Sequence, residues 1–210
     1  MSSAALRMSA ANTAVILDFE TTGLSPGMGD RAIEIGAVRL DNGRVTGRFQ
    51  ELMNPGQRID GFIESYTGIT NEMLKDARTC GEVMRDFADF IGSYNLVAHN
   101  ASFDKRFLDA ELERVSMAYS GQFACSMLAA RRIFQHAPNH KLSTLVAHIN
   151  ISVEGVFHRA LYDSEMTAKL WLAMLGDIGQ LYEITDIPFG LMQKLTKTPK
   201  HSVRSLFERA

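Results

Sequence analysis

The chain has 210 residues, of which 46% are hydrophobic and 22% are charged, as in a soluble globular domain with a sizeable core. No apolar run approaches the roughly 20 residues that span a bilayer, and residues 1–12 lack a signal-peptide core, so we expect a cytoplasmic protein with no membrane partner. The formal net charge of −2 excludes a histone-like positive coat. This charge is compatible with an enzyme that binds phosphates through metal ions.

The first predicted element is a buried strand that leads into two acids. Residues 14–17 form a continuous apolar run with β-branched members, and Asp18 and Glu20 follow. Because side chains alternate along a strand, these two carboxylates point to the same face. Adjacent carboxylates repel each other, and a divalent cation between them removes that repulsion. The pair therefore predicts a metal site.

Periodicity and turn residues predict the later elements. In chain order they are strands over 32–40 and 45–53, a short helical segment from Thr70, a helix over 80–91, a strand over 96–98, and helices over 102–114, 125–135, 141–149 and 160–175. An Asn-Gly turn at 42–43 favours a hairpin, and Ser102 is the predicted N-cap of its helix. Strands followed by mixed strands and helices indicate an α/β layer with helices packed on a central mixed sheet.

The chain also contains two cysteines and a charged C-terminal stretch. Cys80 and Cys125 are too few for a disulfide framework, and we interpret both as reduced structural residues in helical, core-like surroundings. From Asp186 onward, five Lys and Arg residues stand against two acids. We interpret this stretch as a solvated basic tail.

Two further acids lie at predicted helix starts. Asp104 falls in the first turn of the 102–114 helix, where the helix dipole favours a negative charge, and Asp163 falls in the first turns of the last helix. Each has a structural explanation when taken alone, and His158 alone is more often structural than catalytic. Their order and context favour the functional interpretation.

Three motifs occur in order: Asp-x-Glu-Thr-Thr-Gly-Leu at 18–24, His-Asn-Ala-x-Phe-Asp at 99–104 and His-Arg-Ala-x-x-Asp at 158–163. They resemble the exonuclease motifs of the DEDDh (DnaQ-like) family, which includes the proofreading ε subunit of bacterial DNA polymerase III, oligoribonuclease and ribonuclease T. The resemblance runs from about residue 13 to 175. It implies an α/β, ribonuclease H-like fold with a central mixed five-stranded sheet flanked by helices.

The resemblance also implies the roles of the site residues. Two Mg²⁺ or Mn²⁺ ions would be held by Asp18, Glu20, Asp104 and Asp163, and His158 would be the general base. Hard oxygen ligands suit these ions better than zinc, and an imidazole with a pKa near 6.5 accepts a proton at neutral pH. Positions five apart on a helix diverge by roughly 140°, so we expect His158 in the loop before the helix of Asp163.

Substrate contacts are implied for the turn after the first acids and for three later positions. These residues are Thr21, Thr22, Gly23, Leu24, Phe62, Thr67 and Asn100. We expect Phe62 in a loop, where its ring could stack on a base, and several relatives carry histidine at the place of Thr67. A turn role explains Asn100 equally well.

The expected function is 3′→5′ hydrolysis of single-stranded DNA ends to nucleoside 5′-monophosphates, in proofreading or repair, with a DNA polymerase as a candidate partner. Three alternatives stay open: an exoribonuclease of the oligoribonuclease or ribonuclease T type, a non-catalytic module that binds a polymerase or nucleic acid, and a small-molecule phosphodiesterase. The expected domains are a flexible segment over 1–12, the exonuclease domain over 13–178 and the basic tail over 179–210.

Overall fold

A computed structural model describes residues 10–153, 155 and 157–209. Its sheet has five strands in the order β3-β2-β1-β4-β5. β1 pairs antiparallel with β2 and parallel with β4, so the predicted mixed sheet is confirmed. The strands are β1 (Ala14–Thr21), β2 (Ala32–Asp41), β3 (Arg44–Leu52), β4 (Leu96–Ala98) and β5 (Phe123–Cys125).

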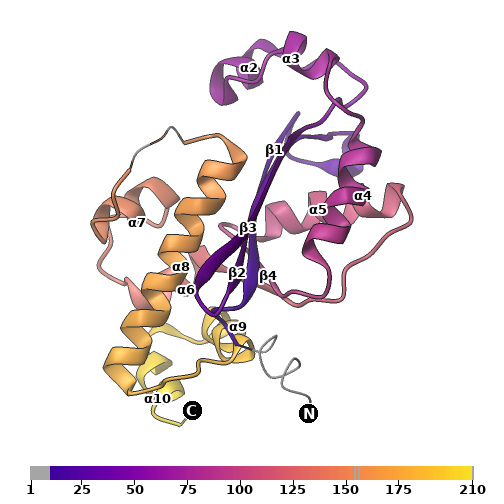
Figure 1. The fold of residues 1–210 in the computed structure, drawn as a ribbon. Coiled ribbons are helices and arrows are strands. Elements are labelled where there is room, and N and C mark those ends of the chain that lie inside the picture. The colour runs from indigo at the N-terminus through magenta and orange to yellow at the C-terminus, as the bar shows by residue number, and fades with distance from the viewer. Residues whose placement is uncertain (1–9, 154, 156, 210) are drawn as a thin grey trace.

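Helices cover both faces of this sheet (Figure 1). They are α2 (Gly61–Thr67), α3 (Asn71–Lys75), α4 (Cys80–Ile91), α5 (Ser102–Arg114), α6 (Ser126–Ile133), α7 (Leu142–His148), α8 (Ala160–Tyr182), α9 (Phe189–Lys197) and α10 (Val203–Phe207), with short 3-10 turns η1 (Pro26–Met28) and η2 (Lys200–Ser202). Within these described residues, none of the helices has the length and apolar character needed to cross a bilayer.

The alternation of β1 sorts its side chains between two cores. Val15 and Leu17 pack with α4 and α5, whereas Ala14 and Ile16 pack with α8 and α9. Since side chains on one face repeat every second residue, Asp18 continues the α8 face of the sheet. The predicted strand therefore delivers its acids to the side on which α8 lies.

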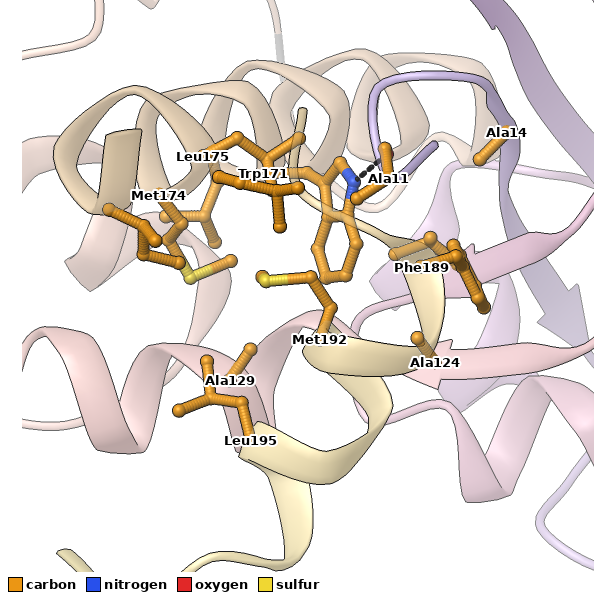
Figure 2. Close-up of a cluster of buried hydrophobic side chains, with 14 of the residues drawn as sticks. Ala11, Ala14, Ala124, Ala129, Trp171, Met174, Leu175, Phe189, Met192 and Leu195 are labelled. Carbon is orange, nitrogen blue, oxygen red and sulfur yellow. Dashed lines mark hydrogen bonds between the residues drawn. The ribbon is translucent and has the colours of Figure 1, made fainter. Parts of the chain in front are cut away.

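The chain from Phe189 to Phe207 is folded, and the prediction of a solvated tail is wrong there. Phe189, Met192 and Phe207 are buried against α8 and the sheet. Trp171 stands at the centre of this cluster (Figure 2), and its Nε1–H donates to the carbonyl oxygen of Ala11 at 2.7 Å. Ala11, from the expected flexible segment, thus belongs to the core, while residues 1–9 lie outside the described part.

Four smaller expectations are corrected. Ser102 is the first residue of α5 and makes no capping bond; Ala101 holds the N-cap position. Phe62 lies in helix α2 and not in a loop. The N-cap of this helix is Asp60, whose side chain accepts a hydrogen bond from a backbone N–H. Cys125 ends β5, half-buried, where the sequence suggested a helix. The last long helix continues seven residues past 175, to Tyr182.

Candidate active site

Four carboxylates converge at one end of β1. Asp18 and Glu20 come from the strand itself, and Asp163 comes from the first turn of α8. Asp104 lies in the first turn of α5, and its Oδ1 accepts a hydrogen bond from the backbone N–H of Phe19 at 3.1 Å. The structure therefore brings together the four acids that the three motifs single out.

A glycine on β2 lets α8 approach closely enough to deliver its acid. Gly36 is paired with Asp18 across the sheet, and a Cβ at Gly36 would lie only 2.0 Å from the backbone nitrogen of Leu161. The hydroxyl of Ser164 donates to the carbonyl oxygen of Gly36 at 2.8 Å. This contact, possible only without a side chain at position 36, sets the distance between Asp163 and the strand acids.

The acids disfavour their own ionisation in the absence of a cation. Burial raises the pKa of Glu20 to about 8, of Asp104 to about 7 and of Asp163 to about 6. The pKa of Asp18 is also raised, first by burial and then by repulsion from the three other acids of the cluster and from Glu34. Oδ1 of Asp163 is buried and has no hydrogen-bond partner among the described residues. Hard oxygen donors, one of them orphaned, fit a divalent cation.

His158 lies in the loop before α8, as the spacing to Asp163 predicts. Its φ is 71°, and its backbone N–H donates to Oδ2 of Asp163 at 2.9 Å. Ligand atoms of Glu20, His158 and Asp163 all lie within 4.8 Å of one another. The imidazole centroid is 4.1 Å from the ring of Tyr66, and partial burial lowers the pKa of His158. Burial thus favours the uncharged form of the imidazole, which faces the acids.

Sequence reasoning missed an ion pair that holds this loop. Glu34 is fully buried directly opposite Glu20, and Arg159 binds it with Nη2 at 2.9 Å and Nε at 3.2 Å. The backbone N–H of Ala160 also donates to Glu34, at 3.1 Å. The residue next to His158 is thereby tied to β2 by a bidentate pair. The sequence feature that could have indicated this ion pair is a glutamate inside the apolar run of 32–40.

The expected substrate residues differ in how far their side chains are exposed. Leu24 and Phe62 are 75% and 71% exposed, and Phe62 stacks on Tyr66 with centroids 5.7 Å apart. Tyr66, which was missed, thus continues a row of rings from Phe62 to His158. Thr67 is buried, and its hydroxyl is bonded within its own turn, to Ile63 and Ile69.

The remaining expected contacts lie in tight turns. The hydroxyl of Thr21 donates to the carbonyl oxygen of Gly23 at 2.6 Å, and Thr22 donates to Asp30 at 3.3 Å. A Cβ at Gly23 would lie 2.5 Å from the carboxylate of Asp30. Asn100 is exposed and has a φ of 65° at the entry to α5. The turn contacts and the backbone conformation therefore give these residues a structural role.

The metal-free protein is expected to lose stability as the pH rises from about 5 to about 8. The folded pKa values of Glu20, Asp104 and Asp163 exceed the ordinary carboxyl values of 3.8 to 4.5. In this window the folded state binds more protons than the unfolded state, so the free energy of unfolding falls with rising pH. Because a cation binds the ionised carboxylates, the increase in Tm on adding Mg²⁺ should be larger at pH 8 than at pH 6.

Thermal unfolding followed by circular dichroism, with EDTA or with about 10 mM MgCl₂ at each pH, measures this difference. A Tm in EDTA that rises between pH 6 and pH 8, or a Mg²⁺ effect that is equal at both, would contradict the assignment of the carboxylates as a cation site.

Three buried acids, the half-buried Asp18 and a histidine on a ribonuclease H-like fold define a nuclease. A family model described as "Exonuclease" (RNase T) matches residues 15–171, and the chain belongs to this family of DEDDh 3′→5′ exonucleases. Members of the family are metal-dependent enzymes.

Relatives include the PolC-type DNA polymerase III of Bacillus cereus, 38% identical over 173 residues, and that of Bacillus subtilis, 37% identical over 179 residues. The matches cover 82% and 84% of this chain but only 12% of each polymerase. A structure of exonuclease X in complex with 5′ overhanging duplex DNA is 28% identical, covers 87% of this chain and 99% of that one, and has a TM-score of 0.67. The nuclease domain of 3′hExo, 21% identical over 79% of this chain and 92% of its own, shares the fold with a TM-score of 0.68.

Proposed function

We propose that this chain hydrolyses single-stranded DNA from the 3′ end and releases nucleoside 5′-monophosphates with two bound Mg²⁺ or Mn²⁺ ions. The observation that carries the proposal is the buried Oδ1 of Asp163, which has no hydrogen-bond partner among the described residues and lies with three other carboxylates beside the imidazole of His158. Exonuclease X, which is similar along most of the chain, is bound to DNA, and the PolC relatives are DNA polymerases. These relatives support DNA as the substrate and a DNA polymerase as a partner.

The four acids Asp18, Glu20, Asp104 and Asp163 would hold the ions, which when bound neutralise the phosphodiester and lower the pKa of a water molecule. The imidazole of His158 accepts a proton from the attacking water at its unprotonated ring nitrogen. The water oxygen bonds to phosphorus as the bond to the 3′ oxygen breaks, and the departing 3′ oxygen takes a proton from solvent. The products are a nucleoside 5′-monophosphate and a strand shortened by one nucleotide, with a new 3′ hydroxyl.

Residues around His158 keep its ring in place for this proton transfer. The pair of Arg159 with Glu34 anchors the loop on one side, and the ring of Tyr66 packs on the imidazole on the other. The bond from the His158 N–H to Asp163 fixes the backbone. The general base is thus positioned by three contacts from three different elements.

The terminal nucleotides would lie between the turn after β1 and helix α2. The backbone of Thr21, Thr22 and Gly23, with Leu24 and Asn100, would border the terminal nucleotide, and the exposed ring of Phe62 would stack on a base. Thr67 would contribute only through its backbone, because its hydroxyl is occupied. Unpairing a duplex end costs energy, so a frayed or single-stranded end is the better substrate.

An assay with 5′-labelled DNA and RNA oligonucleotides of one sequence tests the proposal. Stepwise shortening from the 3′ end that requires Mg²⁺ or Mn²⁺ and stops in EDTA is the expected result, with DNA cleaved faster than RNA. Faster cleavage of RNA would reverse the substrate assignment. Failure to cleave either, with folded, metal-bound protein, would favour a non-catalytic binding module.

Replacement of Phe62 by Ala is expected to raise KM for a single-stranded DNA about tenfold while kcat changes little. Stacking of one base on an aromatic ring contributes roughly 1–3 kcal/mol, and the Phe62 ring is largely exposed although it stacks on Tyr66. Steady-state kinetics measures the two constants separately. Val45→Ala, a change at another exposed apolar residue on β3, serves as the control. An unchanged KM would remove Phe62 from the substrate site.

A further inference from the structure

The charges of this chain are unevenly distributed. Residues 114–153 and 187–207 contain eight of the 22 Lys and Arg residues and none of the 24 Asp and Glu residues. The two stretches pack against each other: Nε of Arg132 donates to the carbonyl oxygen of Thr198 at 3.1 Å, and Gln135 donates to that of Lys200 at 3.4 Å. The fold therefore gathers positive charge on one surface of a chain that is acidic overall.

Five side chains of α6, α9 and η2 define this basic surface: Arg131, Arg132, Lys194, Lys197 and Lys200. Arg132 is half-buried and the other four are exposed. None of the five forms an ion pair with any residue in the described ranges 10–153, 155 and 157–209. Their charges are left to a partner or to solvent ions.

Structural roles account for only part of this charge. Helices α6 and α9 both end here, and each helix C-terminus carries roughly half a negative charge, so together they offset about one of the five cations. Asp177 and Asp186 border the surface. Even with both acids counted, an excess of about two positive charges remains.

The basic surface lies far from the catalytic acids. Figure 1 places α9 and α10 at the opposite end of the molecule from α2 and α3. Arg132 and Lys200 line a hollow with Ile178 of α8, which is about 22 Å along the helix from Asp163 at 1.5 Å per residue. With phosphates about 3.4 Å apart along a stacked strand, six or seven nucleotides cover this length. A stacked strand shorter than that does not reach from the acids to this surface.

We propose that the basic surface binds the phosphate backbone of the nucleic-acid strand whose 3′ end lies in the active site. The assignment rests on the proposed function, since the strand must enter there. A nucleic acid fits better than an acidic protein because protein interfaces centre on apolar or aromatic anchors. Of the large apolar side chains exposed in the described part of the chain, only Leu181 borders this surface.

The test compares the double variant Lys197→Gln/Lys200→Gln with Arg44→Gln/Arg85→Gln, which removes equal charge from exposed residues of β3 and α4. Binding of labelled single-stranded DNA of about 20 nucleotides is measured by fluorescence anisotropy in EDTA, and hydrolysis is measured on strands of about 20 and about 3 nucleotides. Affinity for the long strand should fall about tenfold at 0.1 M salt, and the slope of log K against log salt should become shallower by about 1.4.

For hydrolysis, KM for the long strand should rise about tenfold, while the short strand and the control variant should behave as wild type. Equal losses on long and short strands, or an unchanged salt slope, would overturn the proposal. So would binding of polyglutamate, but not DNA, that depends on the two lysines. Because the anisotropy arm needs no catalysis, DNA binding that depends on the lysines without hydrolysis would support this surface even if the proposed function failed.

Discussion

Replacement of Asp163 by Asn is expected to reduce hydrolysis about a thousandfold and to stabilise the metal-free protein at the same time. The amide oxygen can still accept the N–H of His158, so the loop is retained. The site loses one of the four carboxylates that we propose as metal ligands, which a cation-dependent reaction tolerates poorly. It also loses one of four mutually repelling charges, that of Asp163, whose buried Oδ1 has no hydrogen-bond partner in the described part of the chain.

The gain in stability should be visible as a Tm in EDTA about 3 °C above wild type at pH 8, since about 1 kcal/mol shifts the Tm of a domain of this size by 2–4 °C. Addition of Mg²⁺ should raise the Tm of wild type more than that of the variant. Asp177→Asn, at an exposed position of the same helix, is the control. It should change neither the Tm in EDTA nor the rate of hydrolysis of short strands. An inactive variant with a lowered Tm would mean that Asp163 acts through structure and not through the cation.

Replacement of Gly36 by Ala is expected to remove both activity and several kcal/mol of stability. The new methyl would lie 2.0 Å from the nitrogen of Leu161 and 2.1 Å from the carbonyl carbon of Ala160, both backbone atoms that cannot rotate away. Overpacking against backbone typically costs 1–3 kcal/mol and here must also displace the start of α8. Asp163 would move with the helix, and hydrolysis would fall at least a hundredfold.

Gly176→Ala is the control, because Gly176 lies in α8, the helix that Gly36→Ala would displace, and its new methyl would meet no atom within 4 Å outside the adjacent backbone of that helix. Alanine is a better helix former, so this variant should be as active as wild type and more stable by about 0.5–1 kcal/mol. Denaturant unfolding and the exonuclease assay measure both variants. Full activity and stability of Gly36→Ala would show that α8 can approach β2 in another way.

The positions of the side chains that we propose as catalytic could be predicted from the sequence because their geometry is local. Alternation along one strand places Asp18 and Glu20 together, and a five-residue offset separates His158 from the helix of Asp163. The residues that support them were not predictable. The pairing of Glu34 with Arg159 joins positions far apart in the sequence, and the contact of Tyr66 with His158 depends on where α2 lies.

The C-terminal helices show why composition misled the prediction. Phe189, Met192 and Leu195 recur at helical spacing in α9, but Lys194 and Lys197 alternate with them and dominate the charge. A nine-residue helix is not stable alone, and α9 is stabilised by its packing against Trp171 and the sheet. The three-residue strand β5 is likewise too short for a period-two pattern to appear.

The single tryptophan provides an intrinsic fluorescent reporter for this part of the fold. Trp171 is fully buried, and its indole N–H bonds to Ala11 at the point where α8, α9 and the start of β1 meet. Its emission should be blue-shifted in the native state and should move to the red when α9 undocks. The side chain lies about two turns of α8 beyond Asp163, so the signal reports opening of this end of the sheet separately from events at the carboxylates.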